Sequence, residues 1–373
     1  MRRHERTGLL AEGQRIHGNK YVVERYLGEG ASAEVYRVRH MYLGHQALKV
    51  FRGAGMTQAE TEGLLDEAIL LSQIGHPNVV RVFDADTIEL AHGSCGYFTM
   101  EYVGGGTLAG FWRSHDRHFV PIDTTVDIIS QVCRGLAVAH GKSPPIIHRD
   151  IKPQNILVGY DGSGLRARVS DFGLAKRVNP LSLMASARGT LAFKAPETFV
   201  DPGADSCAGD VWALGTVAYL LLTDHLPHGD LTDLELVNGA AAERPILVPS
   251  RLNLDVDPEL ERIVLKALAA RPDDRYPTAA AMLDDLVGFS TETRPTGKVL
   301  APALTSKVSI TTAASSFDQA RAQAMAEQAL ATARQGSNMS EAADLMEEAF
   351  NLGPGLRDRH ASRVRLWRRG IVQ

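Results

Sequence analysis

The spacing of apolar and polar residues predicts strands in the first part of the chain and mostly helices beyond it. Residues 21–27 and 34–38 have a strand-like pattern and flank a glycine-rich turn. Residues 58–74 place apolar side chains at helical spacing, and residues 126–140 repeat that spacing. The longest apolar run, residues 211–222, also predicts a helix. Further strands are predicted at residues 47–50, 79–84, 96–102, 156–158 and 167–169.

The two ends of the chain differ from this central part. Residues 1–15 are expected to form a flexible or lightly packed leader. Residues 290–316, rich in Thr, Ser, Ala and Pro, are typical of a linker. Residues 317–334 and 340–352 then predict two alanine-rich amphipathic helices, the second of which resembles one unit of a tetratricopeptide-type hairpin. Because one unit cannot bury its own apolar face, the tail (residues 317–373) should either pack on the rest of the chain or dock a partner.

The last stretch of the tail, residues 356–369, carries six arginines. Two interpretations remain open for this stretch. It is either a helix with a solvated basic face or a docking surface for an anionic partner.

The composition is that of an ordinary soluble protein, with 373 residues, 44% of them hydrophobic and 23% charged. A formal net charge of -4 argues against a general nucleic-acid binder. Cys95, Cys133 and Cys207 lie far apart without CxxC spacing, which favours reduced thiols in the cytoplasm. The N-terminus lacks the apolar core of a secretion signal, and the apolar run at residues 211–222 is too short to cross a bilayer. The sequence therefore predicts a cytoplasmic protein without a membrane span or a specific nucleic-acid partner.

A short polar segment, residues 148–155, carries the groups that phosphoryl transfer requires. It places the carboxylate of Asp150, the ammonium of Lys152 and the carboxamide of Asn155 close together, where a proline prevents a helix. Such groups can accept a hydroxyl proton, offset charge on a moving phosphoryl group and bind magnesium. Asp171 follows sixteen residues after Asn155, in the triplet Asp-Phe-Gly, and could also hold a metal. Taken alone, the segment could still be an ordinary polar turn between two strands.

Together these motifs resemble the catalytic loop and metal-binding turn of the eukaryotic-type (Hanks-type) serine/threonine protein kinases, as in a bacterial-like soluble member. The resemblance covers residues 16–289. It implies an α+β fold of two lobes, a β-rich N-lobe (residues 16–102) and a larger α-helical C-lobe (residues 108–289), followed by the helical tail. It also implies ATP and Mg²⁺ as cofactors and proteins with Ser or Thr hydroxyls as substrates.

In this resemblance, Asp150 orients and deprotonates the acceptor hydroxyl and Lys152 offsets charge on the moving phosphoryl group. Asn155 and Asp171 hold magnesium. Lys49 lies in Ala-Leu-Lys-Val, which is similar to the Val-Ala-Ile-Lys signature of the third kinase strand, and would bind the α- and β-phosphates. A lysine at a strand edge with its ammonium in water is the alternative for Lys49.

The partner of Lys49 is expected on the helix predicted at residues 58–74. Glu67 is the candidate for this ion pair, and Glu60 and Glu62 are its alternatives on the same helix. Those two are better read as solvated carboxylates of the first turn, where the helix dipole favours them.

The glycine-rich turn would cover the ATP phosphates with backbone amides, because glycine lets the chain approach closely. Gly28 and Gly30 begin the kinase pattern GxGxxG, but Ala33 occupies the place of its third glycine. Around the adenine, the resemblance implies an apolar ceiling and floor, a gatekeeper (Met100) and hinge backbone groups. The nucleotide-contacting residues are then Gly28, Gly30, Val35, Ala47, Lys49, Met100, Glu101, Val103 and Leu157.

Residues of the activation segment and the large lobe complete the resemblance. Lys152 and Thr190 follow the serine/threonine pattern and not the tyrosine-kinase pattern. Lys194 departs from the more usual apolar residue, which leaves the shape of the substrate pocket open. Ser186 is the first candidate for a regulatory phosphate and Ser182 the second. Structural support is implied for Arg149, Thr190, Glu197, Asp210 and Arg275.

The resemblance therefore implies a signalling kinase that phosphorylates its own activation segment. Two other functions stay open. One is a pseudokinase scaffold, and the other is a helical-repeat adaptor regulated by nucleotide binding.

Overall fold

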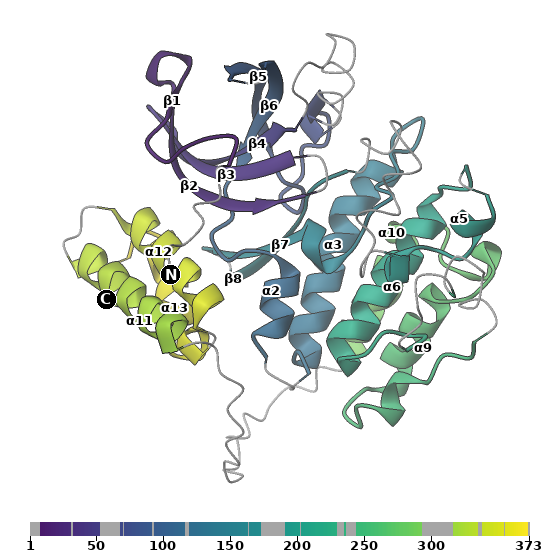
Figure 1. Ribbon diagram of the computed structural model, residues 1–373. Helices are drawn as coiled ribbons and strands as arrows, with labels where there is room; N and C mark the ends of the chain where they lie inside the picture. Colours follow the sequence, from purple (N-terminus) through teal and green to yellow (C-terminus); the bar gives the residue numbers. More distant parts are fainter. Residues whose placement is uncertain are drawn as a thin grey trace.

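The computed structural model describes residues 8–30, 33–52, 68–69, 71–91, 93–115, 119–162, 164–172, 191–201, 203–229, 235, 244–292, 316–334, 338–353 and 355–371. Its described part has a strand-rich N-terminal lobe, a helical C-terminal lobe and a separate group of helices from the tail (Figure 1). The expected α+β two-lobed fold is confirmed.

The N-terminal lobe is a six-stranded sheet with the order β1-β2-β3-β4-β6-β5, in which every neighbouring pair is antiparallel. Tyr21, Val23, Tyr36 and Val38 are buried on one face of its first hairpin, as the strand-like pattern predicts. The strands are β1 (Arg15–Ile16), β2 (Tyr21–Glu29), β3 (Ala33–His40), β4 (Gly44–Phe51), β5 (Val82–Leu90) and β6 (Gly93–Glu101).

Two of these findings differ from the sequence pattern. Strand β5 begins at Val82 and ends at Leu90, whereas the sequence predicted a strand over residues 79–84. The prediction stopped early because exposed Asp86 and Glu89 hide the strand pattern beyond residue 84. The described part of the predicted leader, residues 8–15, is also more firmly packed at Leu10 than expected. Leu10 is buried, and its backbone amide donates a hydrogen bond of 3.1 Å to the hydroxyl of Tyr36 on β3.

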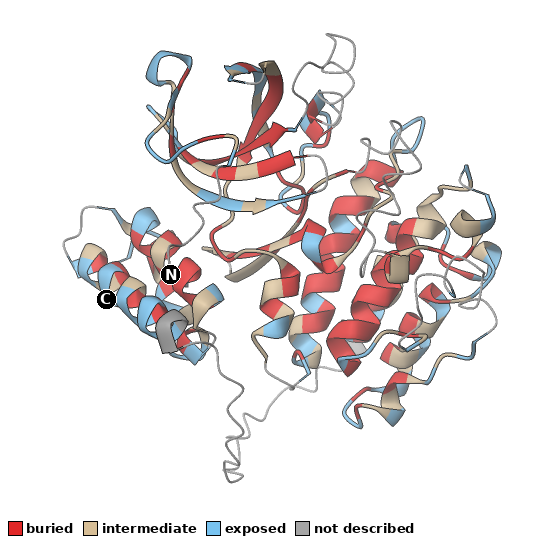
Figure 2. Ribbon diagram, in the orientation of Figure 1, coloured by how far each residue is buried: buried red, intermediate tan, exposed pale blue. Residues whose placement is uncertain are grey.

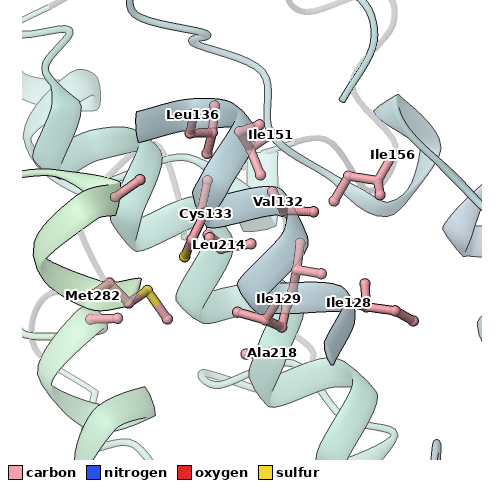
Figure 3. Packing of buried hydrophobic residues seen from close by; sticks show 14 of the residues in the cluster. Ile128, Ile129, Val132, Cys133, Leu136, Ile151, Ile156, Leu214, Ala218 and Met282 are labelled. Atoms are coloured by element: carbon pink, nitrogen blue, oxygen red, sulfur yellow. The ribbon is translucent and has the colours of Figure 1, made fainter. Parts of the chain in front are cut away.

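The C-terminal lobe packs its helices around the long helix α3 and the apolar helix α6 (Figures 2 and 3). Figure 3 shows Val132 and Ile129 of α3 close to Leu214 and Ala218 of α6, with Met282 of α10 beside them. The helices are α2 (Leu108–Arg113), α3 (Ile122–His140), α5 (Glu197–Val200), α6 (Cys207–Thr223), α9 (Pro258–Ala267) and α10 (Ala279–Glu292).

Short elements connect these helices and carry much of the site. The hairpin of β7 (Ile156–Asp161) and β8 (Gly164–Val169) forms the two-stranded sheet of this lobe. The side chain of Thr107 caps α2 by accepting a hydrogen bond from the amide of Gly110. The 3₁₀ turns are η1 (His17–Asn19), η2 (Pro153–Asn155), η4 (Leu191–Phe193), η5 (Pro249–Arg251) and η6 (Pro272–Asp274).

The tail consists of α11 (Ser316–Arg334), α12 (Met339–Leu352) and α13 (Gly355–Arg368). These helices form their own hydrophobic core, in which alanines let the helices approach closely and Trp367 and Phe350 fill the remaining space. Figure 1 shows them beside β7 and below the N-terminal sheet. The helices therefore pack on the rest of the chain, which is one of the two alternatives left open by the sequence.

Candidate active site

An ion pair joins the two lobes between β4 and the segment after β8, the region that we call the cleft. Strand β4 carries Lys49, which is 9% exposed, and the chain after β8 carries Asp171. The ammonium Nζ of Lys49 lies 2.5 Å from the carboxylate Oδ1 of Asp171. Lys49 thus reaches across the cleft, and its ammonium lies at the carboxylate predicted to hold metal and not out in water at a strand edge.

The backbone at Asp171 is left-handed, with φ of 57°. This conformation is uncommon for residues other than glycine, and Asp tolerates it better than most because its short side chain can bond locally. The next residue, Phe172, is fully buried, and its ring lies 4.5 Å from the ring of His148. Burial lowers the pKa of His148, which favours the neutral imidazole.

The catalytic loop brings Asp150, Lys152 and Asn155 together. The ammonium of Lys152 lies 2.9 Å from Oδ2 of Asp150. Asn155, at the end of the turn η2, donates from Nδ2 to Oδ2 of Asp150 at 3.0 Å and to its backbone carbonyl at 2.8 Å. Two donors therefore fix the orientation of the Asp150 carboxylate.

The same two hydrogen bonds also orient the amide group of Asn155. Because the amide nitrogen is directed at Asp150, the amide oxygen is turned away from that carboxylate. An amide oxygen and the carboxylate of Asp171 are the oxygen ligands that hard divalent cations prefer, so both residues fit such an ion.

The backbone of the catalytic loop is held by Asp210, a fully buried carboxylate in the first turn of α6. It accepts hydrogen bonds from the backbone amides of His148 at 2.7 Å and Arg149 at 2.9 Å. The ring of His140 is a third partner, 3.0 Å away. Burial alone would raise the pKa of Asp210, but these partners outweigh burial and hold the pKa below its usual value.

A second buried pair lies further from the chemistry. The guanidinium of Arg275, with its side chain fully buried, forms two parallel hydrogen bonds of 2.7 and 2.8 Å with Glu197. It also lies over the ring of Trp212, 4.7 Å from the ring centroid. This pair joins the start of α5 to the segment before α10.

The residues predicted to enclose adenine lie in one apolar cluster. Ala47 and Met100 are buried and face each other across β4 and β6, while Val35 and Leu157 are half-buried against them. Gly28 pairs with Val35 across the β2–β3 hairpin, which places the glycine-rich turn next to this cluster. Gly30 donates its amide to the carbonyl of Ala33 at 2.9 Å.

The hinge follows β6 and is tightly packed. The amide of Glu101 bonds to the carbonyl of Arg81 at 2.8 Å, and its carboxylate lies 2.8 Å from Arg168 of β8. Val103 lies close to Gly159 of β7. The hinge is thereby held on both lobes.

Beside the catalytic loop, a pocket is lined by Asp150, Phe193 and Lys194, among others. The ammonium of Lys194 donates to the backbone carbonyl of Arg149, so the unexpected lysine is bonded to the loop itself. Arg149 has a left-handed backbone, and its Nε lies 2.9 Å from a carboxylate oxygen of Asp205.

Four of the predicted site residues lie outside the described part of the chain. They are Glu67, Ser182, Ser186 and Thr190. The alternatives to Glu67, which are Glu60 and Glu62, lie outside it as well.

Sequence reasoning missed the contacts that the tail makes with the hinge and the sheet. Glu348 of α12 binds Arg25 and Arg37, residues more than three hundred positions away. The helical spacing of Asp344, Glu347 and Glu348 in α12 was the signal that one helix face carries charge. It could not indicate which basic residues that face meets.

A protein kinase domain model matches residues 21–308, so the chain belongs to the protein kinase family. Members of this family transfer the γ-phosphoryl group of ATP with the help of divalent metal ions. The resemblance found in the sequence is therefore confirmed at the level of the family.

Several bacterial protein kinases are similar to the chain. The tyrosine-protein kinase MasK of Myxococcus xanthus is 32% identical over 289 residues, covering 73% of this chain and 43% of the relative. The serine/threonine-protein kinase PknB of Mycolicibacterium smegmatis is 34% identical over 276 residues, 72% of this chain and 43% of the relative. The serine/threonine-protein kinase Pkn1 of Myxococcus xanthus is 33% identical over 299 residues, 76% and 40%. The chain thus spans less than half the length of these relatives. Among the described residues, no helix is both long and apolar enough to cross a membrane.

Proposed function

We propose that this protein is a serine/threonine protein kinase that uses ATP and Mg²⁺ to phosphorylate protein hydroxyls. The observation that supports this most is the catalytic loop, where Lys152 and Asn155 both contact the carboxylate of Asp150. The carboxylate of Asp150 is fixed by these two donors and is still 16% exposed. A turn with a purely structural role does not require this combination.

In this proposal, Asp150 accepts the proton of the acceptor hydroxyl. The ammonium of Lys152, 2.9 Å from that carboxylate, is close enough to offset negative charge on the transferred group. Asn155 keeps the carboxylate oriented through its two hydrogen bonds. Orientation of this kind lowers the entropic cost of reaching the reactive geometry.

Lys49 and Asp171 are the residues that would bind the phosphates and the metal ion of the nucleotide. When bound, magnesium neutralises charge on the phosphates, and Asp171 and Asn155 are the residues that would hold it. Lys49 places its positive charge next to Asp171, where the phosphates would gather. Val35, Ala47, Met100 and Leu157, which lie in one apolar cluster, would contact the adenine, and the backbone of Glu101 and Val103 would meet its edge.

Serine or threonine as acceptor is the finer part of the proposal. It rests on Lys152 in the catalytic loop and on Thr190, which follow the serine/threonine pattern. One of the similar proteins is named a tyrosine kinase, so the acceptor must be identified by experiment. The proposal includes phosphorylation of the chain itself at Ser186 or Ser182, and a cytoplasmic location in which Cys95 and Cys133 stay as buried thiols.

The test is to incubate the purified protein with ATP and Mg²⁺ and to map phosphorylated residues by mass spectrometry. Casein serves as an added acceptor, and the Asp150→Asn variant is the control for contaminating kinases. The proposal predicts phosphoserine or phosphothreonine with the parent protein only. No phosphate in the parent, or phosphotyrosine alone, would overturn it.

A further inference from the structure

The tail helices α12 and α13 lie across the hinge and contact both lobes (Figure 1). They meet strands β2, β3 and β4 on one side, and β7 and α2 on the other. Nothing in the proposed phosphoryl transfer uses these contacts. They nevertheless link the elements that carry the nucleotide site.

Towards the N-terminal lobe, the contacts are ionic and centre on Glu348. Its carboxylate, with a side chain only 5% exposed, lies 2.6 Å from the guanidinium of Arg25 on β2. The same oxygen accepts hydrogen bonds from Arg37 on β3 and, at 2.6 Å, from the hydroxyl of Tyr102 in the hinge. The carboxylate of Glu348 therefore contacts two strands and the hinge at the same time.

A second acidic residue of α12 reaches the third strand. Oδ2 of Asp344 lies 3.0 Å from Nδ1 of His45 on β4. Arg368 of α13 binds the other oxygen of Asp344 at 2.6 Å, so α13 holds this carboxylate in place.

At the hinge itself, α12 packs directly on the backbone. Asn351 donates to the carbonyl of Gly104 at 3.3 Å. A Cβ atom at Gly104 would meet Glu347 at 3.1 and 3.3 Å, and one at Gly106 would meet Asn351 at 3.1 Å. At Gly105, a Cβ would lie 2.2 Å from the carbonyl oxygen of Val158. The three glycines therefore allow close packing on the tail and on β7, in addition to any freedom they give the hinge.

Towards the C-terminal lobe, the contacts are largely aromatic. The rings of Tyr160 on β7 and Phe350 on α12 lie 6.4 Å apart in an edge-to-face arrangement. Arg357 of α13 lies over the ring of Phe111 on α2, 4.5 Å from its centroid, and donates to the hydroxyl of Ser114 at 2.6 Å. Two arginines of the basic stretch, Arg357 and Arg368, therefore face inward, whereas Arg359, Arg363, Arg365 and Arg369 are exposed, as a solvated basic face requires.

From this arrangement we infer that Glu348 is a positioning residue for the nucleotide, acting through Arg25, Arg37 and Tyr102 to fix the glycine-rich hairpin above the hinge. This inference rests on the proposed function. Its structural basis is the sheet register, in which Arg37 lies directly opposite Ala47, the predicted adenine ceiling. Arg25 precedes Gly28 by three residues on the same strand.

The tail contacts the C-terminal lobe by aromatic packing and the N-terminal sheet by ion pairs, and this difference explains how it would position the sheet. Aromatic packing fixes the tail to the C-terminal lobe, and the ion pairs of Glu348 and Asp344 then hold the N-terminal sheet at one angle to it. In this braced state Lys49 meets Asp171 across the cleft. Loss of the ion pairs should leave each lobe folded but let the sheet move relative to the hinge, which weakens nucleotide binding.

The test compares Glu348→Gln with Glu341→Gln in the full chain. Both changes remove one negative charge from α12 while keeping the shape of the side chain, but Glu341 is exposed and forms hydrogen bonds with Asn338 in its own helix cap. Two quantities are measured without added protein substrate. They are the dissociation constant of Mg·ATP and the rate of amide hydrogen exchange in β2, β3 and the hinge.

The inference predicts that Glu348→Gln weakens Mg·ATP binding about five- to tenfold and speeds amide exchange in these segments, while Glu341→Gln changes neither. If Glu348→Gln binds Mg·ATP like the parent, the inference is overturned, even if exchange is faster, because the contact would then only hold the tail. Weaker binding in both variants would also overturn it, since the effect would come from the charge of the helix and not from this contact.

The outcome stays separate from that of the proposed function. A parent protein that binds Mg·ATP but transfers no phosphoryl group would overturn the kinase activity, and the binding comparison would still decide the role of Glu348. An active kinase whose nucleotide affinity does not depend on Glu348 would overturn only the present inference.

Discussion

Two groups of carboxylates differ in their access to water: Asp150 and Asp171 in the cleft, and Asp344, Glu347 and Glu348 on α12. The cleft side chains are 16% and 37% exposed. Those on α12 are 8%, 1% and 5% exposed and are enclosed by Arg25, Arg37, His45 and Arg368. Both groups meet cations, but only the cleft group can also meet a substrate.

The comparison separates two uses of the same side chain. A carboxylate that reaches solvent can exchange protons and bind metal, whereas an enclosed one is fixed by its partners and in turn fixes them. Glu347 shows how strongly the surroundings act, because burial raises its pKa to about 7 although Arg368 lies 2.9 Å away. We therefore assign chemistry to the cleft group and positioning to the α12 group.

The largest expected effect comes from Asp150→Asn, which removes the proposed base while keeping the shape of the side chain. We expect the rate of phosphoryl transfer to fall by about 10²–10⁴-fold, with Mg·ATP affinity almost unchanged. Initial rates at saturating ATP measure this. A variant that keeps more than about a tenth of the parent rate would show that Asp150 is not the base.

The next largest effect is expected from the loss of Arg275. Its ion pair with Glu197 is enclosed like those on α12 but lies in the C-terminal lobe. Arg275→Ala leaves Glu197 without its bidentate partner, and we expect a loss of about 3–5 kcal/mol in the free energy of unfolding. Chemical denaturation gives this value. Arg262→Ala is the matched control, because its ion pairs with Glu259 and Asp285 are about half and about one-third exposed and should contribute much less to stability. Equal losses in the two variants would contradict the distinction between enclosed and exposed pairs.

Asp171→Asn should affect metal-dependent nucleotide binding. Asn tolerates the left-handed backbone at this position, so the fold should be kept, but a neutral amide holds a divalent cation weakly. We expect the gain in ATP affinity on adding Mg²⁺ to fall about tenfold or more. Titration of ATP with and without Mg²⁺ decides the matter, and an unchanged gain would place the metal elsewhere.

The smallest effect concerns His45, at the edge of the enclosed group. Hydrogen bonds to Asp344 and then to Glu24 raise its pKa to about 9, against the opposing charge of Arg37. Because the pKa is raised in the folded state, the stabilisation is full below pH 6.5 and is lost as the pH rises through about 9.

Melting temperatures between pH 6.5 and 9 check this sign. The parent should lose about 1 kcal/mol of stability relative to His45→Gln over this interval, since a pair that keeps some contact with water is partly screened. Parallel curves for the two proteins would mean that the pKa of His45 is not raised in the folded state.

The arrangement of the catalytic loop and of the glycine-rich hairpin could be predicted from the sequence, because the residues that form each of them are close together in the chain. Asp150, Lys152 and Asn155 lie within six residues, and the β2–β3 hairpin brings Gly28 to Val35 by direct pairing. Short-range patterns of this kind determine geometry almost without reference to the rest of the fold.

The tail contacts could not be predicted in the same way. Arg25, Arg37 and His45 look like solvated residues of a sheet, and Glu347 and Glu348 like the polar face of a helix. Only the docking of α12 on the hinge gives them partners. The extension of β5 was missed for a related reason, since its charged outer face hid the strand pattern.

The most direct test of the assignment is to measure kcat and Mg·ATP affinity side by side for Asp150→Asn and Glu348→Gln. The account predicts that Asp150→Asn loses kcat by at least about a hundredfold and keeps Mg·ATP affinity within about twofold. Glu348→Gln should weaken that affinity about five- to tenfold and keep kcat within about threefold. The same pattern in both variants, or the reverse of this one, would contradict the division between carboxylates that react and carboxylates that position.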